Sequence, residues 1–395
     1  MINTSNDPHS ALNQFQKCLI VHPSFSQEKD QSRSAEEKLQ EACGLAAAID
    51  LEVLHSEIIQ VRSPKSAKLF GAGTISRIAK FLSPDIIYNA LDPSAASSSK
   101  QPINNLKKAK KSIPISLVIV NISLSPIQQR NLERVWKTSV MDRTGLILEI
   151  FAQRANSKEG RLQVQLAALT YQRSRLVRTW THLERQRGAL GFIGGPGETQ
   201  IESDRRLIDN RINQIKSQLN DVKRTRRLQR KSRKRVPYPS LALVGYTNAG
   251  KSTLFNKLTF SNVEAKDQLF ATLDPTMRKI DLPCNETAIL SDTVGFVSDL
   301  PHELITSFHA TLEEIREADL ILHVRDIAHP ETESQKSDVI KVLDSLGILA
   351  GDFSSNDMSN TSHIKIPCLE IINKIDLLTR DQVLVQNNRV KRNNN

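Results

Sequence analysis

The sequence is poor in cysteine and contains no long apolar run. Its four cysteines are Cys18, Cys43, Cys284 and Cys368. They lie far apart without the spacing of metal ligands, so we expect reduced structural thiols rather than a disulfide framework or a zinc site. No apolar run approaches the roughly 18 residues that a membrane-spanning helix needs, and Met1 to Asn13 lacks the charged and apolar regions of a signal peptide. These absences predict a soluble, cytoplasmic protein without a membrane span.

Basic residues outnumber acidic residues in this sequence. The chain has 54 Lys and Arg against 43 Asp and Glu, a formal net charge of +11, which suggests a polyanionic partner if the cations gather in one place. Nine of them follow Asp221 without an intervening acidic residue: Lys223, Arg224, Arg226, Arg227, Arg230, Lys231, Arg233, Lys234 and Arg235. A solvated face normally mixes both signs, so this run favours binding to a phosphate backbone. It lacks the aromatic anchors of a membrane-surface helix.

At 395 residues the chain is long enough for two or three domains. We expect a disordered tail over 1–15, an α/β domain over 16–150, a helical hairpin over 151–236 and a further domain over 237–395. The first domain alternates strands (17–22, 51–61, 116–120) with helices (34–49, 74–82, 125–136), the pattern of βαβ units. Ser34 and Glu37 have the spacing of a capping box. Residues 92–114 are rich in Ser, Ala, Lys and Asn, which predicts a solvated, mobile excursion.

A seven-residue repeat occupies residues 157–235. One apolar seam is formed by Leu162, Leu169, Leu176 and Leu183, with Leu166 and Trp180 at the complementary position. The other is formed by Ile201, Ile208, Ile215 and Val222, with Ile212 and Leu219 at the complementary position. Two such seams predict an antiparallel hairpin of long helices. Its connection, Gly188 to Glu198, holds five of the fifteen glycines, more than a turn requires. This tip either conforms to a binding partner or is a flexible turn. Val236 to Pro239 then ends the second helix and serves as a linker.

The segment Gly245-Tyr246-Thr247-Asn248-Ala249-Gly250-Lys251-Ser252 follows the apolar run Leu241 to Val244 and opens a helical pattern. This is the setting of a phosphate-binding loop. Backbone N–H groups and the helix dipole can wrap a β-phosphate, the Lys251 ammonium can reach the β and γ oxygens, and the Ser252 hydroxyl can ligate Mg²⁺.

Three more stretches fall in the order of a guanine-nucleotide domain. Asp292-Thr293-Val294-Gly295 follows a strand pattern, which places Asp292 where it can hold Mg²⁺ through water and Gly295 where its N–H can meet a γ-phosphate. Asn373-Lys374-Ile375-Asp376 follows another, and the Asp376 carboxylate can accept from guanine N1–H and its amine, which adenine does not offer. Asn373 can contact the other edge of the base, and the stem of Lys374 can cover the ring. We therefore expect GTP rather than ATP.

The third stretch, Phe270-Ala271-Thr272-Leu273-Asp274, lies between the phosphate-binding loop and Asp292. It occupies the loop position where a threonine can complete the Mg²⁺ shell. Thr276 competes with Thr272 for that role, and spacing alone does not choose between them.

Together these motifs make the chain resemble the HflX family of ribosome-associated GTPases, which is related to Obg. The resemblance covers most of the chain. It rests on the long stretch Gly194 to Arg206, on Met141 to Thr144 with Ile150 to Ala152, on Phe270 to Asp274, on Asp292 to Phe296 and on Asp299 to His302.

The resemblance implies an α/β fold: an N-terminal α/β domain with a long helical hairpin, followed by a P-loop GTPase domain. It assigns the Mg²⁺ role to Thr272 beside Ser252, and it implies GTP hydrolysis in which Lys251, Thr272 and Gly295 take part. It further implies association with the large ribosomal subunit and its RNA, in the rescue or splitting of stalled ribosomes, by a protein that we expect to be a monomer when free.

Two departures from the family pattern stand out. Phe296 follows Gly295 where many small GTPases carry a glutamine that orients water, so we expect slow hydrolysis without a partner. The chain also stops about twenty residues after Asp376, whereas the family continues through a final strand, a Ser-Ala loop and a closing helix. We therefore expect an incomplete nucleotide domain. An insert at 352–363 reads as a polar loop, and Arg325 stands where a strand would carry an aliphatic residue.

Two rival functions follow. The alternatives to a ribosome-associated GTPase are a nucleotide-incompetent remnant that binds RNA alone and a regulatory GTPase that acts on protein partners without RNA. The first predicts no nucleotide binding, and the second predicts complexes that resist nuclease.

Overall fold

The structure is a computed structural model that describes residues 17–25, 33–82, 115–187, 196–233, 238–260, 269–270, 272–273, 275–283, 286–299, 314–348 and 366–393. Several predictions lie outside the described residues: the tail, the excursion at 92–114, most of the glycine tip, Ala271, Asp274 and the insert at 352–363. No helix in the described ranges is long and apolar enough to cross a membrane.

The chain forms two compact units, Met1–Gln153 with Gln172–Arg205 and Arg154–Tyr171 with Arg206–Asn395. The long helices α5 (Lys158–Arg187) and α6 (Pro196–Arg233) each contribute to both units. Helix α4 (Arg143–Arg154) continues past position 150, where we expected the first domain to end. The proposed division into domains stays a prediction.

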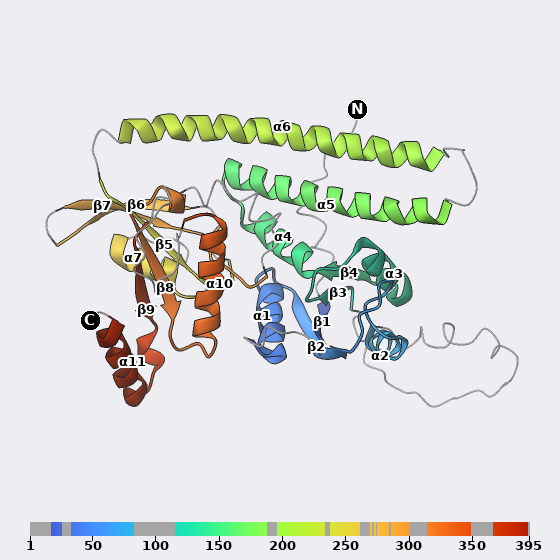
Figure 1. Ribbon diagram of the computed structural model, residues 1–395, viewed down its shortest axis with the longest axis horizontal. Coiled ribbons are helices and arrows are strands. Elements are labelled where there is room, and N and C mark those ends of the chain that lie inside the picture. The colour runs from blue at the N-terminus through green and yellow to red at the C-terminus, as the bar shows by residue number, and fades with distance from the viewer. Residues whose placement is uncertain are drawn as a thin grey trace, which may run out of the picture. The chain divides into compact units, whose positions relative to one another are not determined.

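The sheet of the first unit has four parallel strands in the order β2-β1-β3-β4 (Figure 1). The strands are β1 (Lys17–Phe25), β2 (Glu52–Val61), β3 (Leu117–Val120) and β4 (Ser139–Asp142). The helices that alternate with them are α1 (Ala35–Ala47), α2 (Ala72–Leu82) and α3 (Pro126–Trp136), and α4 follows β4. The predicted βαβ alternation is confirmed. The sequence did not predict β4, whose four residues are too few to show a period.

Helix α1 begins where the sequence predicted. The Glu37 backbone N–H donates to Ser34 Oγ at 3.2 Å, and the Ser34 N–H donates to Glu37 Oε2 at 2.9 Å. Helix α3 begins in the same way, with Ser125 and Gln128 in reciprocal hydrogen bonds. Each box satisfies two N–H groups that a helix start leaves unpaired.

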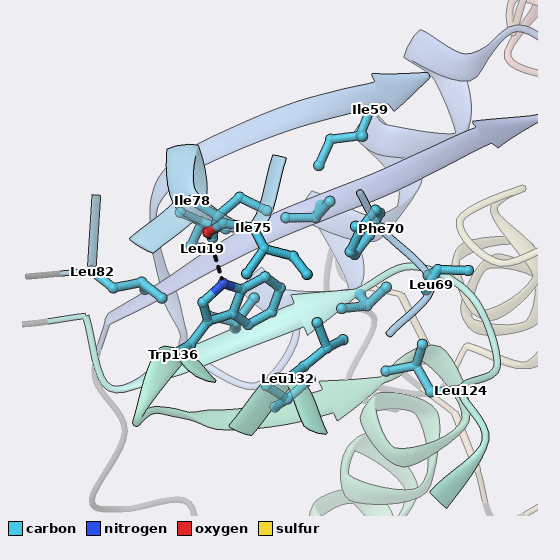
Figure 2. Packing of buried hydrophobic residues seen from close by; sticks show 14 of the residues in the cluster. Leu19, Ile59, Leu69, Phe70, Ile75, Ile78, Leu82, Leu124, Leu132 and Trp136 are labelled. Carbon is cyan, nitrogen blue, oxygen red and sulfur yellow. Dashed lines mark hydrogen bonds between the residues drawn. The ribbon is translucent and has the colours of Figure 1, made fainter. Parts of the chain in front are cut away.

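Apolar side chains from β1, α2 and α3 fill the core of this unit (Figure 2). Trp136 lies at its centre with 1% of its surface exposed. Its indole N–H donates to the backbone oxygen of Ile75 at 3.2 Å, so α3 is joined to α2 inside the core. The hydrogen bond removes the cost of burying that polar group, and the ring contributes a large apolar area.

The two long helices pack in antiparallel fashion through part of the predicted seam. Leu162 of α5 clusters with Ile215 and Leu219 of α6, with Leu166 and Leu169 partly buried against them. The heptad prediction is confirmed there. Side chains at 177–201 and most of those in the basic run lie outside the described residues, although the α6 backbone is helical through Arg233.

The second sheet has the strand order β6-β7-β5-β8-β9, antiparallel only between β6 and β7. Its strands are β5 (Ser240–Gly245), β6 (Thr276–Asp281), β7 (Thr287–Asp292), β8 (Leu320–Asp326) and β9 (Cys368–Asn373). Helix α7 (Lys251–Thr259) follows β5, α10 (Thr332–Ser345) follows β8, and the turn η4 (Ile375–Leu377) and α11 (Arg380–Asn393) follow β9. The predicted nucleotide motifs therefore lie where parallel strands end, the edge at which open α/β sheets bind ligands.

Candidate nucleotide site

The loop between β5 and α7 has the tight packing of a phosphate-binding loop. A Cβ added at Gly250, whose φ is +91°, would lie 2.2 Å from Asn373 Nδ2. A Cβ at Gly245 would lie 2.3 Å from the backbone oxygen of Val324. Both positions therefore require glycine, the first for its left-handed backbone as well as for space.

Lys251 is buried at the start of α7, with 6% of its surface exposed. Its ammonium donates to the backbone oxygen of Tyr246 at 2.7 Å. Burial lowers the pKa of Lys251 to about 8, although the Asp292 charge acts in the opposite direction. A phosphate bound beside this ammonium would favour its charged form and raise the pKa again.

Three oxygen-bearing side chains meet beside it. The Ser252 hydroxyl donates to Asp292 Oδ2 at 2.7 Å, and the Thr272 hydroxyl donates to the same oxygen at 3.0 Å. The two hydroxyl oxygens lie 2.8 Å apart. Burial raises the pKa of Asp292, opposed by the Ser252 hydrogen bond, the Lys251 charge and the Thr272 hydrogen bond. Asp292 Oδ1 is buried and has no hydrogen-bond partner within the described ranges.

This group fits a divalent cation. Hydroxyl and carboxylate oxygens are the ligands that Mg²⁺ prefers, and the unpartnered Asp292 oxygen could accept from a metal-bound water. Thr272 contacts both Ser252 and Asp292, whereas Thr276 lies on β6 as the ladder partner of Asp292. The geometry therefore favours Thr272 over Thr276, and its role as a metal ligand stays a prediction.

The segment after Asp292 lies against the phosphate loop. The Thr293 hydroxyl donates to the Leu243 oxygen at 2.6 Å. A Cβ added at Gly295 would come within 2.9 Å of Thr247 and 3.0 Å of the Lys251 ammonium. Gly295 therefore lies close to the Lys251 ammonium, and its contact with a terminal phosphate stays a prediction. Phe296 is 2% exposed and packs into the protein.

The base motif begins at the last residue of β9. Asn373 donates through its side chain to the Ala249 oxygen at 2.8 Å, which joins this motif to the phosphate loop. Lys374 adopts a left-handed backbone with φ of 59° and pairs with Asp326 Oδ2 at 2.8 Å. Asp376 is exposed in η4, open to a ligand. The sequence did not indicate a role for Asp326, because its partner Lys374 is distant in the chain.

Three further predicted positions have buried side chains, whereas Asn248 and Ile375 are exposed. Phe270 and Leu273 are 2% and 3% exposed, and Val294 is 6% exposed. They support the loops from inside, so only their backbones could meet a nucleotide. Ala271 and Asp274 lie outside the described residues.

Arg325 has a structural explanation that the sequence did not supply. Its guanidinium is hydrogen-bonded to Glu370 on β9, to Glu333 Oε1 at 2.9 Å and to Thr332 Oγ1 at 3.2 Å. Lys336 donates to the other Glu370 oxygen at 3.0 Å. The network joins α10 to β8 and β9, next to the strand ends that carry Asp326 and Asn373. In the sequence, the only sign of this network was an unexpected Arg in one strand pattern and an acidic residue, Glu370, in another.

Comparison with known proteins agrees with these motifs. Three family models match: the N-terminal part of a GTP-binding GTPase over 85–152, its middle region over 154–233, and a 50S ribosome-binding GTPase over 240–374. Among solved structures, a GTP-binding protein of Sulfolobus solfataricus in complex with GDP is similar at 23% identity and a TM-score of 0.43, covering 91% of this chain and 83% of that one.

Curated relatives extend further along the chain. GTPase HflX of Magnetococcus marinus is 49% identical, covering 78% of this chain and 65% of the relative. GTPase HflX of Escherichia coli is 43% identical, covering 92% of this chain and 74% of the relative. The chain thus spans about two thirds to three quarters of the length of these two proteins. By these matches and by the motifs at its site, the chain belongs to the HflX family of GTPases.

Proposed function

We propose that the protein binds GTP with Mg²⁺ and hydrolyses it to GDP and phosphate. The observation that carries this proposal is the convergence of Lys251, Ser252, Thr272 and Asp292 where β5 and β7 end. Ser252 and Thr272 would hold Mg²⁺ directly and Asp292 through water, and the ion would neutralise charge on the phosphates. Gly295 would offer its N–H to the γ-phosphate, and Asp376 would select guanine.

Hydrolysis should be slow in the isolated protein. The Phe296 side chain is buried and carries no group that could orient water. The activating group would therefore come from a partner or from another group of the protein. A partner that supplies it would couple hydrolysis to its own binding.

The partner that we propose is the large ribosomal subunit, contacted through its RNA, in the rescue or splitting of ribosomes in the cytoplasm. The support is the basic run on α6 and the match to a family model described as a 50S ribosome-binding GTPase. Phosphates of RNA would neutralise the cations of the run. A protein-only partner is the competing function.

Titration with mant-GDP, a fluorescent nucleotide, tests the proposal. We expect saturable, Mg²⁺-dependent binding that GTP displaces and ATP does not, and hydrolysis of GTP that large subunits accelerate. Absence of nucleotide binding would leave only the RNA-binding function. Complexes with protein partners that survive nuclease treatment would instead favour the function without RNA.

A further inference from the structure

Tyr246, the second residue of the phosphate loop, makes a contact that the loop pattern does not require. Its hydroxyl oxygen accepts a hydrogen bond from the backbone N–H of Ser298 at 2.8 Å. Tyr246 is 6% exposed and Ser298 is 7% exposed, so water does not compete strongly for this bond. The contact joins the loop to the segment that follows Gly295.

Backbone hydrogen bonds attach the same segment on its other side. The Thr247 N–H donates to the Phe296 oxygen at 2.7 Å, and the Phe296 N–H donates to the Gly245 oxygen at 3.1 Å. Tyr246 and Phe296 thus form an isolated parallel bridge. Of these three bonds, only the one from Ser298 depends on a side chain of the loop.

Gly295 lies immediately before this attachment and is closely confined. The nearest atoms to an added Cβ would be Thr247 Cα and Cγ2 at 2.9 Å and the Lys251 ammonium at 3.0 Å. A small outward movement of residues 296–298 would therefore carry the Gly295 N–H away from Lys251. The phosphate loop itself, which wraps the β-phosphate, need not move.

We propose that the Tyr246 hydroxyl is a positioning group that holds residues 295–298 against the phosphate loop and thereby sets the preference of the site for a nucleoside triphosphate over a diphosphate. The inference rests on the proposed nucleotide site. It assigns to Tyr246 a role in γ-phosphate recognition without direct contact to the nucleotide. Simple core packing by the ring is the alternative.

The substitution Tyr246→Phe in the full chain distinguishes the positioning role from core packing, because it keeps the ring and removes only the hydroxyl. We expect the affinity for mant-GDP to stay within about twofold, whereas affinity for the non-hydrolysable mant-GppNHp should fall about fivefold, the effect of one neutral hydrogen bond. Tyr238→Phe makes the same chemical change at a tyrosine that is 44% exposed, outside the loop, and should change neither affinity.

Hydrogen exchange supplies a readout that packing alone would not move. In Tyr246→Phe the peptide containing Ser298 should exchange faster while that of β5 stays protected. An equal loss of affinity for both nucleotides, or no change in either, would overturn the positioning role. If the unmodified protein bound neither nucleotide, the proposed function itself would fail, and a loss confined to the triphosphate would support both.

Discussion

Lys251 is a buried cation whose charged form a bound phosphate would stabilise. Its ammonium is buried and its pKa is lowered to about 8, so the charged form is held at some cost. Lys251→Ala should weaken GTP binding by at least two orders of magnitude, about 2.7 kcal/mol, because a charged partner of the phosphates is removed. Titration with mant-GTP measures the loss. Unchanged affinity would show that the loop does not hold phosphate.

A substitution at Asp376 tests whether this residue selects guanine. Its exposed carboxylate can only accept hydrogen bonds when ionised, and an amide presents a donor as well. Asp376→Asn should therefore move the preference from GTP toward XTP, whose base has an acceptor where guanine has the amine. Competition between the two nucleotides for mant-GDP measures the shift. Equal competition by ATP and GTP in the unmodified protein would contradict the assignment.

Individual site residues were predictable where local spacing determines them. Lys251 and Ser252 follow from the loop pattern, and Asp292 and Asn373 follow from their places after strands. The contacts of Tyr246 with Ser298 and of Lys374 with Asp326 join residues 52 and 48 positions apart. Such pairs depend on which strands become neighbours, which a single sequence does not display.

At the scale of the secondary-structure element, strand β8 contains a buried histidine. His323 is 4% exposed and has Val244 of β5 and Glu370 of β9 as ladder partners. Burial lowers its pKa from 6.5 to about 4, with Glu370 opposing the shift and Arg325, Lys336 and Lys251 adding to it. The strand therefore contains a histidine that is neutral when folded and takes up a proton near pH 6.5 when unfolded.

This difference predicts a pH dependence of stability. Between pH 6.5 and about 4 the unfolded chain binds the proton and the folded chain does not, so the free energy of unfolding falls as pH decreases through that range. The full contribution is on the order of 3 kcal/mol. Urea unfolding from pH 7 to 4 should show a shallower loss in His323→Leu than in the unmodified protein. An equal loss of the free energy of unfolding in both proteins would show that another group titrates.

Elements were predictable in proportion to their length and their end signals. Helix α1 was located by its capping box and α5 by its heptads, whereas β4 has four residues and α11 is strongly polar. Arg325 looked out of place on an apolar strand, and only the assembled sheet brings it to Glu370 and Glu333.

At the scale of the whole molecule, the basic run and the glycine tip are predicted to serve RNA binding in different ways. Replacing Arg226, Arg227, Arg230 and Lys231 by Gln should flatten the salt dependence of binding to large subunits by several units between about 50 and 200 mM salt, because fewer phosphates are neutralised. Sedimentation with subunits at several salt concentrations measures it. An unchanged slope would exclude the run as the RNA contact.

Changing Gly194, Gly195 and Gly197 to Ala is the matched comparison. Gly197 already lies in the first turn of α6, and the three substitutions stiffen and enlarge the tip without altering its charge. Affinity should then fall at every salt concentration while the slope stays nearly the same. A change of slope would contradict the separation of placement from charge.

The strand order of the first sheet has a consequence for how the protein is made. Strand β1 is an inner strand with six of its nine residues buried, and its second neighbour is β3, so that Lys17 and Ser116 meet across 99 positions. Until residue 120 has been synthesised, one edge of β1 lacks its partner. Parallel pairing over such distances folds slowly and exposes apolar edges meanwhile. The nascent chain should therefore be most prone to aggregation, and most in need of a chaperone, before β3 emerges.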